Sequence, residues 1–204
     1  THGRALAFAT GVKMANPDLK VIVITGDGDA TAIGGNHFIH AARRNIDLTV
    51  LLYNNYIYGM TGGQCSPTTP KGAKASTAQY GNLEPTFNIS GLAKAAGAAF
   101  VARGDVYNVR KLDGLIEKAM DKKGFSLVEV VSPCPTAFGR RNKMASPVKL
   151  MEQLRDSVVS VEKWAKMTDD ERVGHFRTGV LQDIEKPEYT SEYAKFIAKL
   201  KAEK

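Results

Sequence analysis

Short apolar runs alternate with helical patterns along the first part of the chain. Two runs consist of β-branched and aliphatic residues, VIVIT at 21–25 and LTVLLY at 48–53, and such runs are typical of parallel strands covered on both faces. Helical patterns occupy residues 3–15 and 34–43, one before each run. A strand, a helix and a second strand in this order predict a βαβ unit with its ligand site at the carboxyl ends of the strands.

The same alternation continues to residue 131. It predicts further helices and strands at 89–97, 98–102, 107–122 and 125–131. The sequence therefore predicts an α/β fold, a largely parallel sheet flanked by helices. Between the two halves, residues 54–88 are rich in Gly, Pro, Ser and Thr. A connection of that length within a compact domain is usually functional.

The pattern changes after residue 146. Residues 148–163 favour one helix, residues 167–186 are mixed, and residues 191–204 form a charged amphipathic pattern. We therefore expect an α/β domain over 1–150 and a C-terminal helical extension over 151–204. We expect this extension to pack over the domain or over a partner subunit.

Composition narrows the class of protein. The 204 residues include 43% hydrophobic and 24% charged residues, which is ordinary for one globular domain. No apolar run reaches the roughly 18 residues that cross a bilayer, and no signal-peptide pattern opens the chain. We therefore expect a cytoplasmic protein with no membrane partner. Two cysteines make no disulfide framework, so reduced thiols are expected.

The net charge of +7 requires that nucleic acid be considered as a partner. Much of the excess lies in dispersed lysines and in the pair Arg140-Arg141, without interleaved aromatic residues or a recognisable nucleic-acid module. We expect no nucleic acid. A basic face can instead attract an acidic protein.

Polar residues follow both predicted strands of the βαβ unit. Gly26-Asp27-Gly28-Asp29 comes after the first strand, and Asn54-Asn55 comes after the second. Carboxylate and amide oxygens are the donors that a small divalent cation on a phosphorylated ligand requires. Gly26 and Gly28 allow the backbone to approach the phosphate without an intervening Cβ.

The sequence lacks the residues that other interpretations of this segment require. A calcium loop opening at Asp27 would need glycine and glutamate where the chain has Ala32 and Phe38. The dinucleotide pattern G-x-G-x-x-G is absent. A tight turn explains the glycines but not the two asparagines after the next strand. A cofactor site is therefore the better interpretation.

The segment resembles the thiamine diphosphate motif, GDG followed about two dozen residues later by NN. Further segments narrow the resemblance: HGRA at 2–5, NNYIYGMTGGQCSPTTP at 54–70, SPCPT at 132–136 and GRRN at 139–142. Together these segments resemble the β subunits of the 2-oxoacid:ferredoxin oxidoreductases, most closely the 2-oxoglutarate (2-oxoglutarate synthase) type. The resemblance covers roughly residues 1–150.

This resemblance implies a function. It is thiamine diphosphate-dependent oxidative decarboxylation of a 2-oxoacid to acyl-CoA and CO₂, with coenzyme A as co-substrate. Electrons pass through iron–sulfur clusters to ferredoxin, and an α subunit completes an α2β2 enzyme. Pyruvate and branched-chain 2-oxoacids remain open as substrates beside 2-oxoglutarate. Two alternatives remain, a non-redox thiamine diphosphate decarboxylase or synthase subunit, and a catalytically silent assembly subunit.

The resemblance also implies site residues. Mg²⁺ would be held by Asp27, the side chain of Asn55 and the backbone carbonyl of Ile57. The expected cofactor-binding residues are Gly26, Asp27, Gly28, Asp29, Asn55, Ile57, Gly59, Met60 and Thr61. Met60 has an equal alternative as a residue that only fills space. The covalent chemistry belongs to the cofactor, so no catalytic residue is assigned.

Three residues are candidates for a role in catalysis, namely His2, Arg4 and Thr61. His2 and Arg4 open a helix, where anions are favoured, although a plain surface end is a comparable interpretation. Arg140-Arg141 faces a substrate, a partner or only solvent. The acid that activates the aminopyrimidine is expected on the α subunit.

Cys134 lies between two prolines after a predicted strand. In the resembled family a cysteine here completes a four-iron four-sulfur cluster, whose other three ligands lie in a preceding segment. Those cysteines are not in this sequence, so we expect it to be shortened at its N-terminus. The alternative for Cys134 is a small buried apolar residue, and Cys65 is expected to be a bystander.

Overall fold

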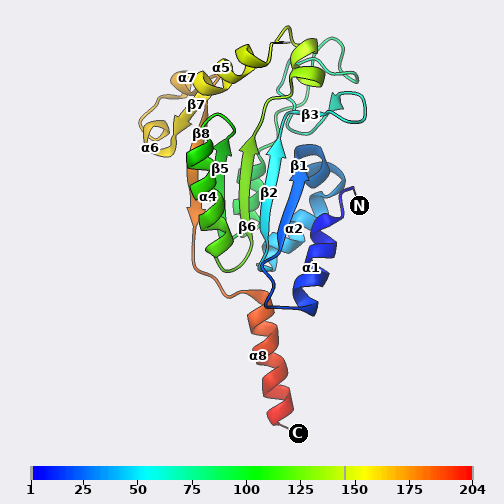
Figure 1. Ribbon diagram of the computed structural model, residues 1–204, viewed down its shortest axis with the longest axis vertical. Coiled ribbons are helices and arrows are strands. Elements are labelled where there is room, and N and C mark those ends of the chain that lie inside the picture. The colour runs from blue at the N-terminus through cyan, green and yellow to red at the C-terminus, as the bar shows by residue number, and fades with distance from the viewer. Residues whose placement is uncertain (1, 145, 204) are drawn as a thin grey trace.

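A six-stranded sheet with helices on both faces forms the centre of the protein (Figure 1). The computed structural model describes residues 2–144 and 146–203. Its strands are β1 (Ile22–Gly26), β2 (Thr49–Asn54), β3 (Ile57–Tyr58), β4 (Gln64–Cys65), β5 (Phe100–Asp105), β6 (Ser126–Val131), β7 (Val158–Ser160) and β8 (Phe176–Asp183). Its α-helices are α1 (Ala5–Ala15), α2 (Gly35–Arg43), α3 (Ile89–Ala95), α4 (Val109–Asp121), α5 (Pro147–Ser157), α6 (Val161–Trp164), α7 (Asp169–Arg172) and α8 (Tyr189–Ala202). Two π-helical turns are η1 (Asp29–Ile33) and η2 (Pro135–Gly139).

The strand order brings the two polar strand ends together. The sheet runs β1-β2-β6-β5-β8-β7, and β1, β2, β6 and β5 pair in parallel. Gly26 at the end of β1 pairs with Tyr53, next to Asn54 at the end of β2. The prediction of a largely parallel sheet is therefore confirmed. Within this sheet, as far as the structure describes it, the antiparallel pair is β8 with its neighbour β5.

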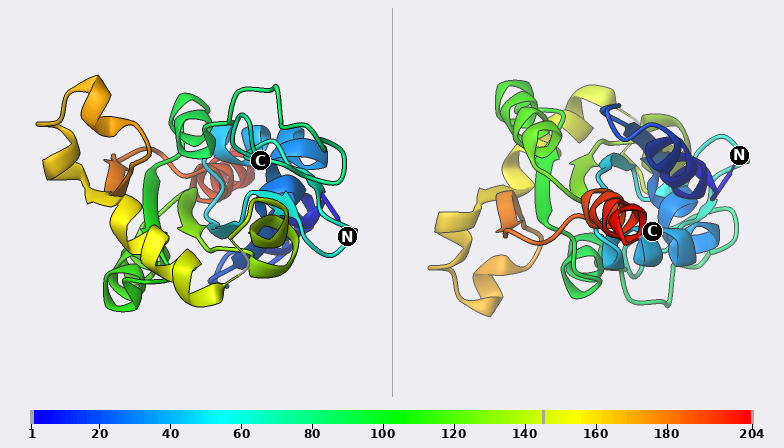
Figure 2. Two further views of the ribbon diagram at one scale, coloured as in Figure 1. Left: turned by 90° about the horizontal axis from the view of Figure 1, so that it is seen from above. Right: turned by 90° about the horizontal axis from the view of Figure 1, so that it is seen from below.

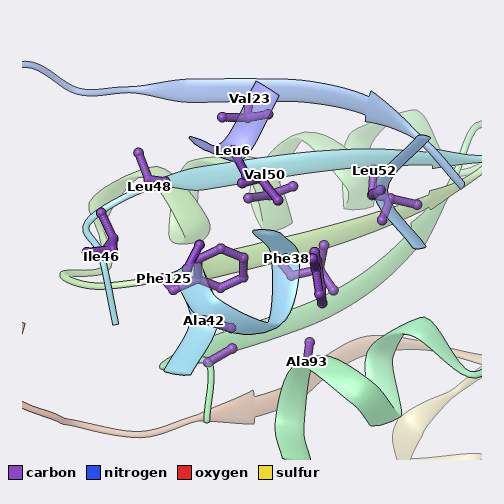
Figure 3. Close-up of a cluster of buried hydrophobic side chains, with 14 of the residues drawn as sticks. Leu6, Val23, Phe38, Ala42, Ile46, Leu48, Val50, Leu52, Ala93 and Phe125 are labelled. Atoms are coloured by element: carbon purple, nitrogen blue, oxygen red, sulfur yellow. The ribbon is translucent and has the colours of Figure 1, made fainter. Parts of the chain in front are cut away.

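Two apolar layers hold the sheet between its helices. On one face, α1, α2 and α3 pack on the sheet through a cluster that includes Leu6, Phe38, Leu52 and Phe125 (Figure 3). The rings of Phe38 and Phe125 meet edge to face, with centroids 5.6 Å apart, which is a favourable arrangement for aromatic rings. On the other face, α4 packs on β5, β6 and β2.

β1 is an edge strand, so the expectation that it is covered on both faces is wrong. Val23 faces the α1 layer and is buried, whereas Ile22 and Ile24 are 43% and 68% exposed. The physical reason is that α4 lies over the middle of the sheet and contacts β2 as its outermost strand on that side. A short apolar run cannot indicate which strand will be outermost.

The C-terminal part differs from the helix expected over 148–163. That segment is broken into α5, β7 and α6. Val158 and Val159 are β-branched and extend the chain, and Ser160 accepts a hydrogen bond from the Lys163 backbone and so begins a new helix. The extension over 151–204 therefore contains helices and also two strands.

The remainder of this extension returns along the sheet. β8 adds to the edge of β5, and α8 then projects beyond the end of the sheet opposite the carboxyl ends of the parallel strands (Figures 1 and 2). The helix expected over 191–204 is confirmed as α8, apart from residue 204, which lies outside the described residues. Within 2–144 and 146–203, every helix is too short or too polar to cross a bilayer.

Glu188 caps α8 and anchors it to the domain. Its carboxylate accepts hydrogen bonds from the backbone N–H groups of Thr190 (2.6 Å), Ser191 (2.8 Å) and Asp47 (3.3 Å). Burial acts to raise the pKa of Glu188, but the hydrogen bonds from Thr190 and Ser191 outweigh it, and the pKa lies below its usual value.

Replacing Glu188 with alanine should lower the free energy of unfolding by about 1 kcal/mol at neutral pH, since a helix cap is lost. A carboxylate with a depressed folded-state pKa stabilises above its unfolded pKa of about 4.3. The contribution disappears as the pH falls through the folded value. Denaturant unfolding of Glu188→Ala from pH 7 down to pH 3 measures this. The control is Glu192→Ala, on the exposed first turn of α8, which should change the free energy of unfolding by less than about 0.5 kcal/mol. If the loss of unfolding free energy in Glu188→Ala did not depend on pH, the capping role would be contradicted.

Candidate functional site

Asp27 is a buried carboxylate at the end of β1, with 3% of its surface exposed. Its Oδ2 accepts hydrogen bonds from the hydroxyls of Ser66 and Thr68, both at 2.5 Å. Burial raises the pKa of Asp27, although these hydroxyls and the backbone of Asn55 act to lower it. All of these partners are neutral. A buried negative charge with neutral partners is costly unless a cation joins it, so the donor set fits a bound metal ion.

Asn55 lies beside Asp27 at the end of β2. Its Oδ1 accepts a hydrogen bond from the backbone N–H of Ile57 (3.3 Å), which closes a tight turn. Within this turn, Tyr56 has a φ of 66°, a left-handed conformation that is uncommon outside glycine. The turn therefore holds the backbone of Ile57 close to the side chain of Asn55, just after the carboxyl end of β2.

The two glycines of the GDG segment differ in their surroundings. The space where Gly26 would carry a Cβ is open, which leaves room for a ligand to approach the backbone. A Cβ on Gly28 would lie 2.3 Å from the ring of Tyr58, and the Tyr58 hydroxyl donates to the carbonyl of Gly28 (3.0 Å). Gly28 thus accommodates Tyr58, a role that the sequence did not indicate.

Asp29 holds the N-terminal segment against β1. Its Oδ1 lies 2.7 Å from Nδ1 of His2 and accepts the backbone N–H of Gly3 at 2.5 Å, and its Oδ2 accepts the hydroxyl of Thr25 at 2.5 Å. Both oxygens are therefore used within the protein, and the structure brings His2 to the same sheet edge as Asp27. Arg4 begins α1 with its side chain exposed.

The loop after Asn55 contains the remaining predicted cofactor residues. Met60 is fully exposed, so it fills no space within this chain, and its side chain is open to a ligand or a partner. The Thr61 hydroxyl donates to Oε1 of Gln64 (2.7 Å). At Gly59, a Cβ would lie 3.9 Å from the Sγ of Cys134, so the cofactor loop and this cysteine are neighbours.

Cys134 follows β6 and caps η2. Its Sγ accepts a hydrogen bond from the backbone N–H of Ala137 at 3.4 Å. Partial burial acts to raise the pKa of the Cys134 thiol, but backbone N–H groups of Phe138 and Ala137 outweigh it, and the pKa lies below its ordinary value. The thiolate is the form that binds metals. Among the described residues, no three His, Cys, Asp or Glu side chains gather to hold a metal.

Comparisons with known proteins show the family of this chain. Residues 1–130 match the family model described as thiamine pyrophosphate enzyme, C-terminal TPP binding domain. The chain is 52% identical over 203 residues to 2-oxoglutarate synthase subunit KorB of Methanocaldococcus jannaschii, covering 100% of this chain and 75% of that protein. The corresponding subunit of Methanothermobacter marburgensis is 53% identical over 188 residues, with 92% and 66% of the two chains covered.

The chain belongs to the β subunits of the 2-oxoacid:ferredoxin oxidoreductases. Among solved structures, 2-oxoglutarate:ferredoxin oxidoreductase from Magnetococcus marinus, determined with 2-oxoglutarate, coenzyme A and succinyl-CoA bound, is 35% identical. The TM-score is 0.85, over 98% of this chain and 68% of the other. The α/β fold and the thiamine diphosphate-binding domain predicted from the sequence are thereby confirmed.

The structure of this β subunit divides the two asparagines between separate tasks. The side chain of Asn55 closes the turn to Ile57 (3.3 Å), whereas the side chain of Asn54 is buried and donates to Oε1 of Glu129 on β6 (2.9 Å). The Oδ1 of Asn54 in turn accepts the backbone N–H of Tyr56 (3.3 Å). Asn54 therefore fixes the turn that presents Asn55, and it is a structural residue.

Glu129 is the centre of a buried network that sequence reasoning missed. Its Oε2 accepts from the Ser90 hydroxyl (2.6 Å) and from Nε of Arg103 (2.9 Å). Burial, with this carboxylate nearby, raises the pKa of Tyr56 to about 12, so the tyrosine stays protonated. A glutamate within the buried run SLVEVV was the sequence signal for this network, because a buried charge requires partners.

The arginine pair after η2 is also divided. Arg141 donates to the carbonyl of Ala137 (3.0 Å) and to that of Gly62 (3.1 Å). It thereby joins the segment of Cys134 to the cofactor loop. Arg140 is exposed and is the member of the pair that can face solvent or a partner.

Proposed function

We propose that this β subunit binds thiamine diphosphate and Mg²⁺ and acts with an α subunit in the oxidative decarboxylation of 2-oxoglutarate, with coenzyme A accepting the acyl group. The observation that supports this most strongly is Asp27, a buried carboxylate with neutral partners beside Asn55 at two adjoining strand ends. The relatives named as 2-oxoglutarate synthase subunits support the choice of 2-oxoacid. The Magnetococcus marinus enzyme with 2-oxoglutarate and coenzyme A bound supports both substrates.

In the proposed site, Mg²⁺ is held by Asp27, the side chain of Asn55 and the carbonyl of Ile57. Diphosphate oxygens and water would supply the remaining ligands. The open space at Gly26 admits the diphosphate to the backbone. When bound, thiamine diphosphate stabilises the negative charge left on the substrate carbon after CO₂ departs. The protein contributes position and electrostatics.

Electrons are proposed to leave through a four-iron four-sulfur cluster that Cys134 ligates, and then to reach ferredoxin. Support comes from the lowered pKa of the Cys134 thiol and from its position next to Gly59 of the cofactor loop. Of the two cysteines of the chain, Cys65 is expected to be a bystander, so the other three cluster ligands are proposed to come from outside these residues. The basic surface of this chain suits an acidic electron acceptor.

The α subunit is proposed to close over the carboxyl edge of the sheet in an α2β2 assembly. The connection between β2 and α3 carries several strongly exposed apolar side chains, among them Met60, Tyr80 and Leu83. Exposed apolar side chains at a site are typical of a surface that a partner covers. The partner would also supply the acid that activates the aminopyrimidine.

Mixing tests this proposal. The β chain alone should show no 2-oxoglutarate-dependent reduction of ferredoxin, because half of the catalytic groups are missing. The complex of this β subunit with the α subunit should show it only with thiamine diphosphate, Mg²⁺ and coenzyme A. Ferredoxin reduction and succinyl-CoA are measured, with pyruvate as the substrate control. Turnover by the 204-residue chain alone would refute the requirement for the partner. Loss of thiamine diphosphate from the complex during gel filtration would favour the alternative of a catalytically silent assembly subunit.

A further inference from the structure

The segment Ser66-Pro67-Thr68-Thr69 lies in the long connection after β2, and so far only its two hydrogen bonds to Asp27 have been described. Its three hydroxyl residues, Ser66, Thr68 and Thr69, are almost completely buried, with exposures of 4%, 0% and 0%. Hydroxyl residues in a loop normally point to solvent. Burial of three hydroxyl residues within four positions means that each hydroxyl must have a polar partner.

Two of these hydroxyls converge on one oxygen of Asp27. Ser66 Oγ and Thr68 Oγ1 each lie 2.5 Å from Oδ2, and 2.9 Å from each other. The two hydroxyls have one proton each, and the carboxylate is the charged acceptor, so both protons go to it. Oδ2 then has both of its lone-pair positions filled, while no side chain of the described residues donates a hydrogen bond to Oδ1.

The third hydroxyl holds the neighbouring strand end. Thr69 Oγ1 donates to the backbone carbonyl of Tyr56 (2.6 Å) and accepts the backbone N–H of Ser66 (2.9 Å). Tyr56 is the residue with a φ of 66°, between Asn55 and Ile57. Such a conformation persists when the surrounding structure fixes it, and the Thr69 hydrogen bond does so.

We propose that Ser66, Thr68 and Thr69 form a hydroxyl clamp that sets the metal site before the cation arrives. Ser66 and Thr68 turn Asp27 so that Oδ1 alone is presented, and Thr69 fixes the turn that brings Asn55 and Ile57 beside it. Mg²⁺ demands near-ideal octahedral geometry, which a carboxylate bound through one oxygen suits. The three residues are positioning residues that touch neither cofactor nor substrate. This inference rests on the Mg²⁺ site of the proposed function.

Binding of Mn²⁺, a paramagnetic substitute for Mg²⁺, tests the clamp without relying on turnover. In the assembled complex with thiamine diphosphate, Mn²⁺ affinity is measured by electron paramagnetic resonance for wild type and Thr68→Val. We expect affinity to fall about 10- to 100-fold, the usual effect of losing a partner of a metal ligand. The same variant should regain most of its kcat at saturating metal and cofactor, while the metal concentration for half activity rises by the same factor.

Matched variants separate the clamp from general damage. Thr68→Ser retains the hydroxyl and should bind Mn²⁺ nearly as wild type does. Thr49→Val removes a buried threonine hydroxyl at the opposite end of β2 and should leave Mn²⁺ binding unchanged. Equal affinity of wild type and Thr68→Val, or failure of Thr68→Ser to restore affinity, overturns the clamp. If wild type itself binds no Mn²⁺ with the cofactor, the metal site of the proposed function fails, and the clamp fails with it.

Discussion

Replacing Asp27 with alanine is expected to abolish Mg²⁺-dependent binding of thiamine diphosphate and, with it, activity. Loss of a partner of a metal ligand costs about 10- to 100-fold in affinity, so loss of the ligand itself should exceed about 100-fold. The fold should remain, since Asp27 lies at the end of β1, outside the apolar layers. The unfolding temperature of the cofactor-free chain should change by less than about 4 °C.

Titration of the α/β complex with thiamine diphosphate at fixed Mg²⁺, followed by calorimetry, measures this loss. Asn55→Ala should weaken binding in the same direction, because it removes an oxygen donor from the same cation. Asp18→Ala, a change of an exposed carboxylate, is the control and should bind as wild type does. Normal cofactor affinity in Asp27→Ala would show that the metal lies elsewhere.

Replacing Cys134 with serine is expected to remove or damage one iron–sulfur cluster of the complete complex. Iron content should fall, and ferredoxin reduction should drop by more than about 100-fold, as for loss of a direct ligand. Thiamine diphosphate binding should be nearly unchanged, because Cys134 neighbours the cofactor loop at Gly59 without a hydrogen bond to it. Iron analysis, visible absorption and ferredoxin reduction are the measurements.

Cys65 provides the matched control for this change. It is a half-buried thiol in the same chain, and its backbone N–H, not its sulfur, makes the hydrogen bond to Thr77 (3.0 Å). Cys65→Ser should therefore keep full iron content and full ferredoxin reduction. Wild-type iron content in Cys134→Ser would make Cys134 a structural thiol. A loss shared by both variants would point to general instability of the complex.

Local patterns predicted the parallel part of the fold because each element has its own signal. The apolar run at 48–53 became β2, and the helical pattern at 34–43 became α2. The prediction of one helix over 148–163 was wrong because Val158 and Val159 adopt an extended conformation and pair with β8, which outweighs the helix propensity of the segment. A pairing with residues almost 20 positions away leaves no periodic signal in the segment itself.

The residues of the candidate site also fall into two groups, those that local sequence patterns indicate and those that only contacts between distant segments reveal. Asp27, Asn55 and Cys134 could be named from the sequence because each follows a strand in a recognisable segment. The partners of Asp27 could not, since Ser66 and Thr68 lie about 40 residues further along the chain, in a loop without regular structure. Glu129 likewise meets Asn54 only because β6 is inserted beside β2.

The sequence by itself determined the α/β alternation, the cofactor segment and the family, because these depend on residue type and spacing along the chain. The tertiary structure alone decided which strand is outermost, which asparagine is structural and which hydroxyls hold the carboxylate of Asp27. Those outcomes depend on contacts between segments far apart in sequence. Hydrogen bonds act over about 3 Å, so only the folded arrangement brings the hydroxyls of Ser66 and Thr68 to one oxygen of Asp27.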